Sequence, residues 1–231
     1  HLERQMGGFG TRAGAGETQI EVDRRMLRKR ISNLQKKLKS IDSERRVQSK
    51  RRQSFFRTSF VGYTNVGKSS LMKAITKSDV LIKNQLFATL DTTVRRLFIG
   101  NSNYVLISDT VGFIRNLPNN LIASFKSTLQ EVVDSNLLLI VLDANSKDLH
   151  NEIATIESVL KEIGANEIDC QYIFNKIDIV DQDRITYLRK SFPEAIMVSA
   201  TRALQLSNIK DIIIDKHKEW SNSLENPLHT Q

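Results

Sequence analysis

Cysteine and long apolar runs are scarce in this chain of 231 residues. The single cysteine, Cys170, excludes a disulfide framework and a zinc site built from several cysteines, and it fits a reducing cytosol. We expect Cys170 to lie in the core. The longest strictly apolar run, Leu137 to Leu142, has six residues, far fewer than the roughly 20 that cross a bilayer, and no secretory segment opens the chain. These absences predict a soluble cytoplasmic protein without stable membrane insertion. The first residue, His1, indicates a fragment or processed form whose natural start is missing.

Positive charge is concentrated near the amino terminus. The formal net charge is +8, but residues 1–58 hold 16 Lys and Arg against 6 Asp and Glu, whereas residues 59–231 hold 18 against 20. This asymmetry predicts a basic arm on a near-neutral domain. A basic arm attracts a polyanion such as RNA or an anionic membrane surface. A solvated basic helix without a specific partner is the alternative.

The basic arm combines a glycine-rich loop with an uninterrupted helical pattern. Five of the ten glycines fall in residues 7–16, which indicates a flexible or tightly turned loop. From residue 24 to about residue 53 there is no Gly or Pro, and apolar residues recur at spacings of 4, 3, 4 and 3. They are Leu27, Ile31, Leu34, Leu38 and Ile41. The spacing predicts a helix with a coiled-coil-like seam, whose partner helix would come from residues upstream of His1 or from a second copy of the chain.

From Phe55 onward, short apolar runs alternate with helical patterns. Expected strands are Phe60-Val61, a hairpin of 96–100 and 104–108, and the runs 137–142, 172–174 and 195–198. Expected helices begin near Lys68 and span about 120–134, 149–163, 182–191 and 208–220. The alternation predicts an α/β fold with a doubly wound, mostly parallel sheet and one antiparallel edge. Ligands bind beyond the carboxyl ends of the strands of such sheets, so we expect the chemistry in the loops that follow them.

The first such loop, residues 62–69, reads G-Y-T-N-V-G-K-S and matches the phosphate-binding pattern G-x-x-x-x-G-K-S/T in full. The glycines allow backbone N–H groups to surround phosphates, and the amino terminus of the following helix adds positive potential. Lys68 would contact the outer phosphates as the catalytic residue, and the Ser69 hydroxyl would ligate Mg²⁺.

Asp109-Thr110-Val111-Gly112 follows the second strand of the hairpin, about 40 residues after Lys68. An acidic residue there can hold the shell of the magnesium ion through water, and Gly112 can donate its N–H to a terminal phosphate. We interpret this segment as the sensor of the last phosphate.

Asn175-Lys176-Ile177-Asp178 ends another strand. A carboxylate in this N-K-x-D pattern accepts both N–H donors of the Watson–Crick edge of guanine, and adenine lacks that donor pair. Ser199-Ala200, after the last strand, can add a backbone N–H for the guanine carbonyl. The predicted ligand is therefore GTP or GDP.

A threonine-rich loop, 87–93, lies between the phosphate loop and the hairpin. It could close over the nucleotide, and one threonine hydroxyl would complete the magnesium shell. We favour Thr89, with Thr92 and Thr93 as alternatives and a plain surface loop as the other interpretation. The complete predicted nucleotide site is Gly62, Tyr63, Thr64, Asn65, Val66, Gly67, Lys68, Ser69, Ser70, Phe87, Ala88, Thr89, Leu90, Asp91, Asp109, Thr110, Val111, Gly112, Asn175, Lys176, Asp178, Ser199, Ala200 and Thr201, with Ser69 and Thr89 as metal ligands.

These motifs together resemble the HflX-type translational GTPases of the Obg and HflX branch. The resemblance rests on H-L-E-R-Q at 1–5, G-G-F-G-T-R-A-G-A-G-E-T-Q at 7–19, D-R-R at 23–25, the phosphate loop, F-A-T-L-D at 87–91 and D-T-V-G-F-I-R-N-L-P at 109–118. Family members usually have proline where this chain has Ala15 and Thr92. These departures concern the rigidity of the loops and leave nucleotide binding unaffected.

The resemblance implies a domain organisation and a partner. Residues 1–53 would be the end of an amino-terminal domain, the glycine-rich loop and part of a coiled-coil linker helix, and residues 54–231 would be the GTPase domain. The implied partner is the ribosome or its large subunit, with a role in splitting or rescuing stalled particles. The resemblance also assigns Ser69 and Thr89 as magnesium ligands. We expect a monomer.

Phe113 occupies the position after D-x-x-G, where many switch GTPases have a glutamine that orients the attacking water. A phenyl ring cannot do this, so we expect slow hydrolysis without the ribosome. Asn65 has the position from which, in some GTPases that lack this glutamine, an asparagine helps to ligate K⁺; capping of the loop backbone is the alternative. In a different functional class, the chain would be a coiled-coil or RNA-binding interaction protein whose GTPase domain is mainly structural.

Overall fold

The computed structural model describes residues 19–51, 54–76, 93–100, 103–110, 112 and 129–225. The chain divides into two compact units, His1–Gln48 and Ser49–Gln231. Among the described residues, no helix combines the length and apolar character needed to span a membrane.

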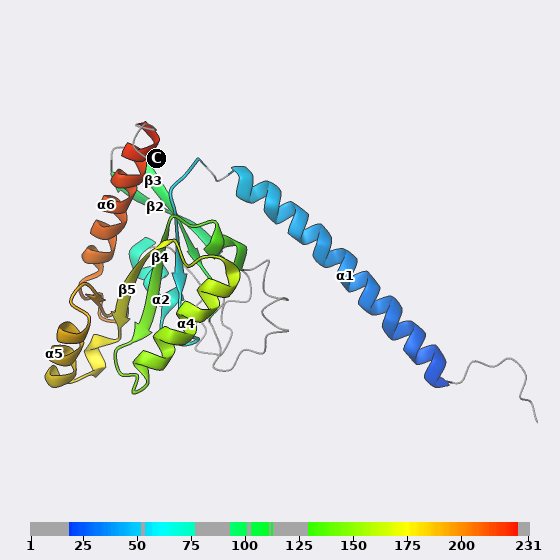
Figure 1. Ribbon diagram of the computed structural model, residues 1–231, viewed down its shortest axis with the longest axis horizontal. Helices are drawn as coiled ribbons and strands as arrows, with labels where there is room; N and C mark the ends of the chain where they lie inside the picture. The colour runs from blue at the N-terminus through cyan, green and yellow to red at the C-terminus, as the bar shows by residue number, and fades with distance from the viewer. Residues whose placement is uncertain are drawn as a thin grey trace, which may run out of the picture. The chain divides into compact units, whose positions relative to one another are not determined.

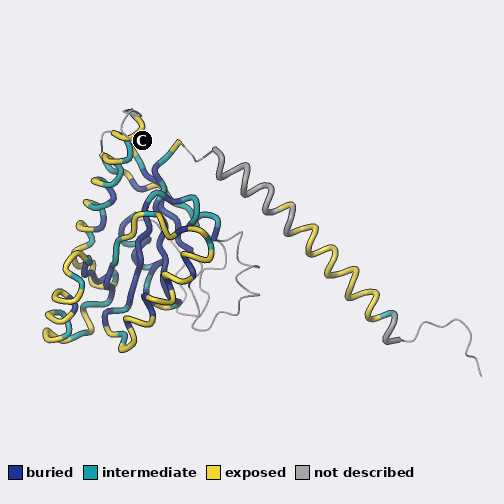
Figure 2. The backbone as a smooth tube through the Cα atoms, in the orientation of Figure 1, coloured by how far each residue is buried: buried dark blue, intermediate teal, exposed yellow. Residues whose placement is uncertain are grey.

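The described part of the first unit belongs to the long helix α1, Gln19–Arg51, whose last three residues fall in the second unit. Helix α1 begins five residues before the expected start. Its apolar stripe is in contact with solvent: Leu27 is 59% exposed, and Ile31 and Leu34 are each 54% exposed. Figure 2 shows this part of α1 as exposed. The predicted seam residues Leu38 and Ile41 lie outside the side chains that the structure describes.

The second unit is built on a six-stranded sheet in the order β2-β3-β1-β4-β5-β6 (Figure 1). Its strands are β1 Arg57–Val61, β2 Thr93–Gly100, β3 Asn103–Asp109, β4 Leu137–Asp143, β5 Asp169–Asn175 and β6 Ile196–Met197. All neighbouring strands run parallel except the edge pair of β2 and β3. The predicted mostly parallel sheet with one antiparallel edge is therefore confirmed.

Helices cover both faces of this sheet. They are α2 Lys68–Thr76, α4 Leu149–Ile163, α5 Gln182–Ser191 and α6 Leu206–Glu225, with a short 3-10 helix, η1, at Ile177–Ile179. Residues 129–133 are also helical and belong to the helix expected over about 120–134, of which residues 120–128 lie outside the described residues.

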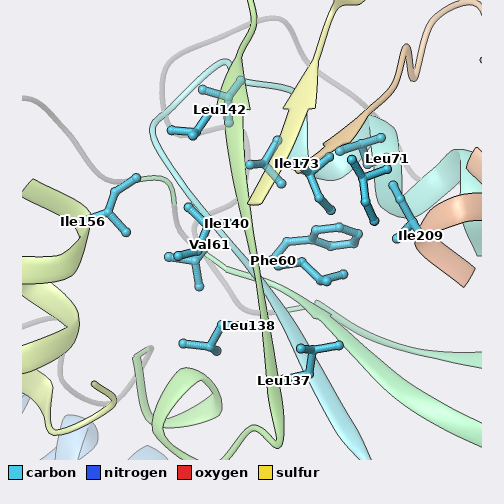
Figure 3. Close-up of a cluster of buried hydrophobic side chains, with 14 of the residues drawn as sticks. Phe60, Val61, Leu71, Leu137, Leu138, Ile140, Leu142, Ile156, Ile173 and Ile209 are labelled. Carbon is cyan, nitrogen blue, oxygen red and sulfur yellow. The ribbon is translucent and has the colours of Figure 1, made fainter. Parts of the chain in front are cut away.

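The core explains why the central strands read as continuous apolar runs. Successive side chains of a strand point to opposite faces of the sheet, and both faces are covered here. Figure 3 shows Val61 and Ile140 beside Ile156 of α4, whereas Phe60 lies with Leu71 of α2 and Ile209 of α6 on the other side of β4. The side chains of Leu137 to Leu142 are accordingly all buried.

Several bounds differ from those expected: β2 and β5 each begin three residues earlier, and α6 spans Leu206–Glu225 instead of 208–220. Two further expectations also differ from the structure. Strand β6 has only two residues, instead of the expected four, because only Ile196 and Met197 pair with β5. The expectation that Cys170 is a core residue is wrong, because it is exposed. Cys170 lies in the first part of β5, where the strand is exposed, and burial begins only at Ile173.

Candidate functional site

The phosphate loop leads from the carboxyl end of β1 into α2. Lys68 is the first residue of α2, and its side chain is buried. Its ammonium group donates to the carbonyl oxygens of Gly62, at 3.0 Å, and Tyr63, at 2.8 Å. Burial lowers the pKa of Lys68 to about 8, and the opposing attraction of Asp109 raises it by less. The loop therefore holds a cation at the helix amino terminus, where anions bind.

Both motif glycines are required by the backbone. Gly62 has φ of +148°, and a Cβ there would lie 2.3 Å from the carbonyl oxygen of Val141. Gly67 has φ of +96°, and its Cβ would lie 2.3 Å from Nδ2 of Asn175. Each position combines a backbone conformation that L side chains rarely adopt with a close neighbour. The spacing of the motif thus reflects packing against β4 and β5.

Asn175, at the end of β5, joins three segments of the site. Its Nδ2 donates to the carbonyl oxygen of Val66 at 2.9 Å, and its Oδ1 accepts the backbone N–H of Ala200 at 3.0 Å. The residue is buried. It therefore fixes the phosphate loop relative to the loop after β6. A guanine carbonyl would share or replace Asn175 Oδ1 as the acceptor for the N–H of Ala200.

The D-x-x-G segment lies against the phosphate loop. Ser69 Oγ donates to Oδ2 of Asp109 at 2.5 Å, and the Thr110 hydroxyl donates to the carbonyl oxygen of Phe60 at 2.6 Å. A Cβ on Gly112 would lie 2.9 Å from Nζ of Lys68 and 2.8 Å from the Cα of Thr64. The absence of a side chain at residue 112 therefore allows this segment to approach Lys68.

The hydroxyl of Ser69 and the carboxylate of Asp109 are hard oxygen donors placed side by side, and Mg²⁺ prefers such ligands. These residues fit the ion that the sequence predicts. No cluster of three or more His, Cys, Asp or Glu side chains that could hold a metal occurs in the described part of the chain. A magnesium site here would therefore need oxygen atoms from elsewhere, as it does where phosphate oxygens and waters complete the shell.

The segment 175–178, which the sequence predicts to recognise the base, begins at the end of β5. Asp178 is exposed, in η1. Lys176 has a left-handed backbone, with φ of 68°, and its Nζ lies 2.6 Å from Oδ2 of Asp143. Ser199 is buried and accepts the backbone N–H of Arg202, whereas Thr201 is exposed.

The remaining predicted residues are placed as follows. Tyr63 and Val66 are buried, Thr64 and Ser70 are intermediate, and Asn65 is exposed with φ of 65°. Several predicted positions lie outside the described residues; they are Phe87, Ala88, Thr89, Leu90, Asp91, Thr92, Val111 and Phe113.

Comparison with known proteins identifies the family. Residues 57–176, more than half of the chain, match the family model described as 50S ribosome-binding GTPase, and residues 1–52 match one described as GTP-binding GTPase Middle Region. A curated protein of Flavobacterium psychrophilum named GTPase HflX is 52% identical over 178 residues, which are 77% of this chain and 43% of that protein. The chain belongs to the HflX-type GTPases. GTPase HflX of Escherichia coli is 44% identical over 204 residues, which are 87% of this chain and 48% of that protein.

This HflX-type chain thus spans about half the length of the curated relatives it matches. Among solved structures, it is similar to a GTP-binding protein of the archaeon Sulfolobus solfataricus in complex with GDP. The TM-score is 0.57 and the identity 26%, over 85% of this chain and 60% of that one. Era of Aquifex aeolicus, bound to GDP and AlF4-, shares the fold, with a TM-score of 0.58 and 20% identity over 70% of this chain and 56% of that one.

Sequence reasoning missed two residues that the structure places beside the predicted site. Asp143 forms an ion pair with Lys176, and Arg184 binds the loop that follows Asp143. A signal for Asp143 was present in the sequence, since it is an acidic residue directly after the buried run 137–142, at the edge of the sheet where ligands bind. The sequence carries no comparable signal for Arg184, which lies on a polar helix with several other charged residues.

Proposed function

We propose that this protein binds GTP and GDP and hydrolyses GTP. The proposal rests on one observation: four loops at the carboxyl ends of the strands are joined to one another by hydrogen bonds. Ser69 contacts Asp109, and Asn175 contacts both Val66 and Ala200. The segments to which we assign phosphate, metal and base binding are thereby joined by hydrogen bonds.

The chemical group of each residue indicates its role in the proposed reaction. Backbone N–H groups of residues 62–70 and the Lys68 ammonium would bind the phosphates, and the charge of Lys68 would stabilise the negative charge that develops during phosphoryl transfer. Ser69 and Thr89 would hold Mg²⁺, which neutralises phosphate charge when bound, and Asp109 would support its shell. Gly112 would donate its N–H to the terminal phosphate, and Asp178 would accept the two N–H donors of guanine. Thr201 would line the base site.

The guanine assignment is tested by Asp178→Asn. A new amide can donate to the extra carbonyl of xanthine, so the preference of the variant should shift from guanine toward xanthine nucleotides. Titrations of GDP and XDP against parent and variant measure this. Unchanged selectivity would overturn the assignment of Asp178, and failure of the parent to bind GDP would overturn the proposed function.

We further propose that hydrolysis is slow in isolation and that the ribosome or its large subunit stimulates it, with a role in splitting or rescue of stalled particles in the cytoplasm. Support comes from Phe113, which occupies the position of a water-orienting glutamine, and from the match of residues 57–176 to the family described as 50S ribosome-binding GTPase. We also propose that the GTPase domain begins at residue 54, as the sequence suggests. We propose in addition that the protein is a monomer. GTP turnover with and without ribosomal particles tests the stimulation.

The basic arm would supply a salt-sensitive share of ribosome binding, because Lys and Arg contacts to phosphates release counterions. Arg28, Lys29, Lys36 and Lys37 are exposed on α1. Their joint replacement by glutamine should flatten the dependence of co-sedimentation on salt. If co-sedimentation depends on salt equally in the parent and the variant, the arm is only a spacer.

One observation favours a second function, that of an interaction protein. Leu27, Ile31 and Leu34 form an exposed apolar stripe on α1, as a helix that binds a partner would. If this function dominates, ribosomal particles will not raise GTP turnover, and Asp178→Asn will leave particle binding unchanged.

A further inference from the structure

The end of β4 and the loop after it, residues 143–148, contain none of the residues predicted from the motifs, yet they lie directly beside the nucleotide site described above. Asp143 is the register partner of Asn175 in the parallel pair of β4 and β5. The next residue, Ala144, donates its backbone N–H to the carbonyl oxygen of Asn175 at 2.9 Å. The sheet therefore places Asp143 level with the start of the base-recognition segment 175–178.

This loop is held in place by two helices. Arg184 of α5 donates from Nε to the carbonyl oxygen of Ala144 at 2.9 Å and from Nη2 to that of Ser146 at 2.5 Å. On the other side, the Ser146 hydroxyl donates to Oε1 of Glu152 on α4 at 2.8 Å. A guanidinium presents its donors in a rigid fork, so Arg184 fixes two carbonyl groups at once. The backbone that carries Asp143 is thus braced before any ligand binds.

Both carboxylate oxygens of Asp143 are used. Oδ1 accepts the backbone N–H of Asn145 at 3.0 Å, and Oδ2 lies 2.6 Å from Nζ of Lys176. The two side chains of the ion pair are 25% and 27% exposed. Exposed ion pairs contribute little because two flexible side chains must be ordered to form them. Here one partner is already fixed by its loop, so most of the ordering concerns Lys176 alone.

We propose that Asp143 is a positioning residue for guanine nucleotides: it holds the side chain of Lys176 in its binding orientation beside Asp178, and Arg184 keeps the loop of Asp143 in place. The inference rests on the proposed function and extends it to residues outside the motifs. A lysine that is ordered in advance loses less rotamer freedom when the base arrives, which strengthens binding without a new contact to the ligand. Base selectivity remains the role of Asp178.

The decisive variant is Asp143→Asn, which retains an acceptor for the N–H of Asn145 and removes the charge that holds Lys176. We expect fluorescently labelled GDP to dissociate about two- to fivefold faster from this variant. The ratio of the affinities for GDP and XDP should stay unchanged. Asp143→Glu restores the charge and should recover part of the slow dissociation. The matched control is Asp215→Asn, which breaks an exposed ion pair with Lys218 on α6 and should leave dissociation unchanged.

A double-mutant cycle separates positioning from a general structural role. Lys176→Met should speed dissociation about as much as Asp143→Asn, and the double variant should add little, because both changes remove one interaction. Arg184→Lys retains Asp143 but loses the paired guanidinium donors to the loop. It should therefore also speed the dissociation of GDP, by a smaller factor. All rates are measured below the unfolding transitions of the variants.

Three results would overturn the inference. They are dissociation from Asp143→Asn at the parental rate, full additivity with Lys176→Met, and a change of the GDP to XDP ratio as large as that of Asp178→Asn. In each case GDP still binds to the parent, so the proposed function survives. Loss of GDP binding by the parent itself would overturn both.

Discussion

Ser69 and Asp109 are 40 residues apart in the sequence and share a hydrogen bond of 2.5 Å between Oγ and Oδ2. The bond joins the first turn of α2 to the end of β3. It brings together a hydroxyl from the phosphate loop and a carboxylate from the segment that we interpret as the phosphate sensor. Neither residue is near the other until β1 and β3 pair in the sheet.

This pair predicts a specific magnesium dependence. In Ser69→Ala, the gain in GDP affinity on adding Mg²⁺ should shrink by at least about tenfold, because one oxygen ligand is removed, while binding in EDTA changes little. Titrations of GDP in Mg²⁺ and in EDTA measure both quantities. Ser70→Ala is the control, since it removes the adjacent hydroxyl and keeps the backbone. An equal magnesium effect in Ser69→Ala and the parent would contradict the assignment.

The lowered pKa of Lys68 predicts a pH dependence of nucleotide binding. Burial lowers this pKa to about 8 in the protein alone, and bound phosphates raise it, because they favour the charged form. The dissociation constant for GDP should therefore be nearly constant between about pH 7 and pH 8, where the terminal phosphate is fully ionised, and rise toward tenfold per pH unit above pH 8. Lys68→Gln should bind weakly and lack this rise. A parental profile that stays flat from pH 7 to pH 9.5 would show that Lys68 does not contact the phosphates.

Gly67→Ala should lower the free energy of unfolding by more than the backbone strain at this position accounts for. Gly67 and Gly100 have similar φ values, +96° and +102°, but a Cβ at Gly100 has no heavy atom within 4 Å, whereas one at Gly67 meets Asn175. Strain of this kind costs about 1–3 kcal/mol at either position, and the clash adds to it only at Gly67. Urea unfolding of Gly67→Ala and of Gly100→Ala measures the difference between their free energies of unfolding. Equal unfolding free energies with retained GDP binding would refute the packing argument.

Asn65 predicts a preference for K⁺ over Na⁺ in turnover. A cation held by its side-chain oxygen would neutralise charge between the outer phosphates, and a positive charge there can raise the rate about 10³- to 10⁵-fold. Asn65 is exposed, with φ of 65°, so its side chain is accessible to such an ion. Turnover is compared in the two salts at fixed ionic strength for the parent and Asn65→Ala. Equal rates would exclude the cation, and fast turnover of the parent in Na⁺ without ribosomes would refute the proposal that Phe113 leaves the site incomplete.

The local features of this protein followed from its sequence. The apolar run 137–142 predicts a strand buried on both faces, and α4 and α5 have the bounds that their patterns indicate. The phosphate loop was equally predictable, because its glycines and lysine serve one short backbone path between a strand and a helix. Such features depend on residues that are neighbours in the chain.

Only the tertiary structure decided how the motifs act on one another. The clamp of Asn175 on Val66 spans 109 residues, and the contact of Arg184 with Ala144 spans 40. No periodicity encodes such contacts, since they arise when parallel strands bring their carboxyl ends to one edge of the sheet. The exposure of Cys170 has the same origin: its apolar character suggested the core, but its place at the open start of β5 leaves it in contact with solvent. The sequence by itself thus determined which chemical groups are present and in which elements, and the pairing order β1-β4-β5 brought Asp143, Lys176 and the phosphate loop to the same edge of the sheet.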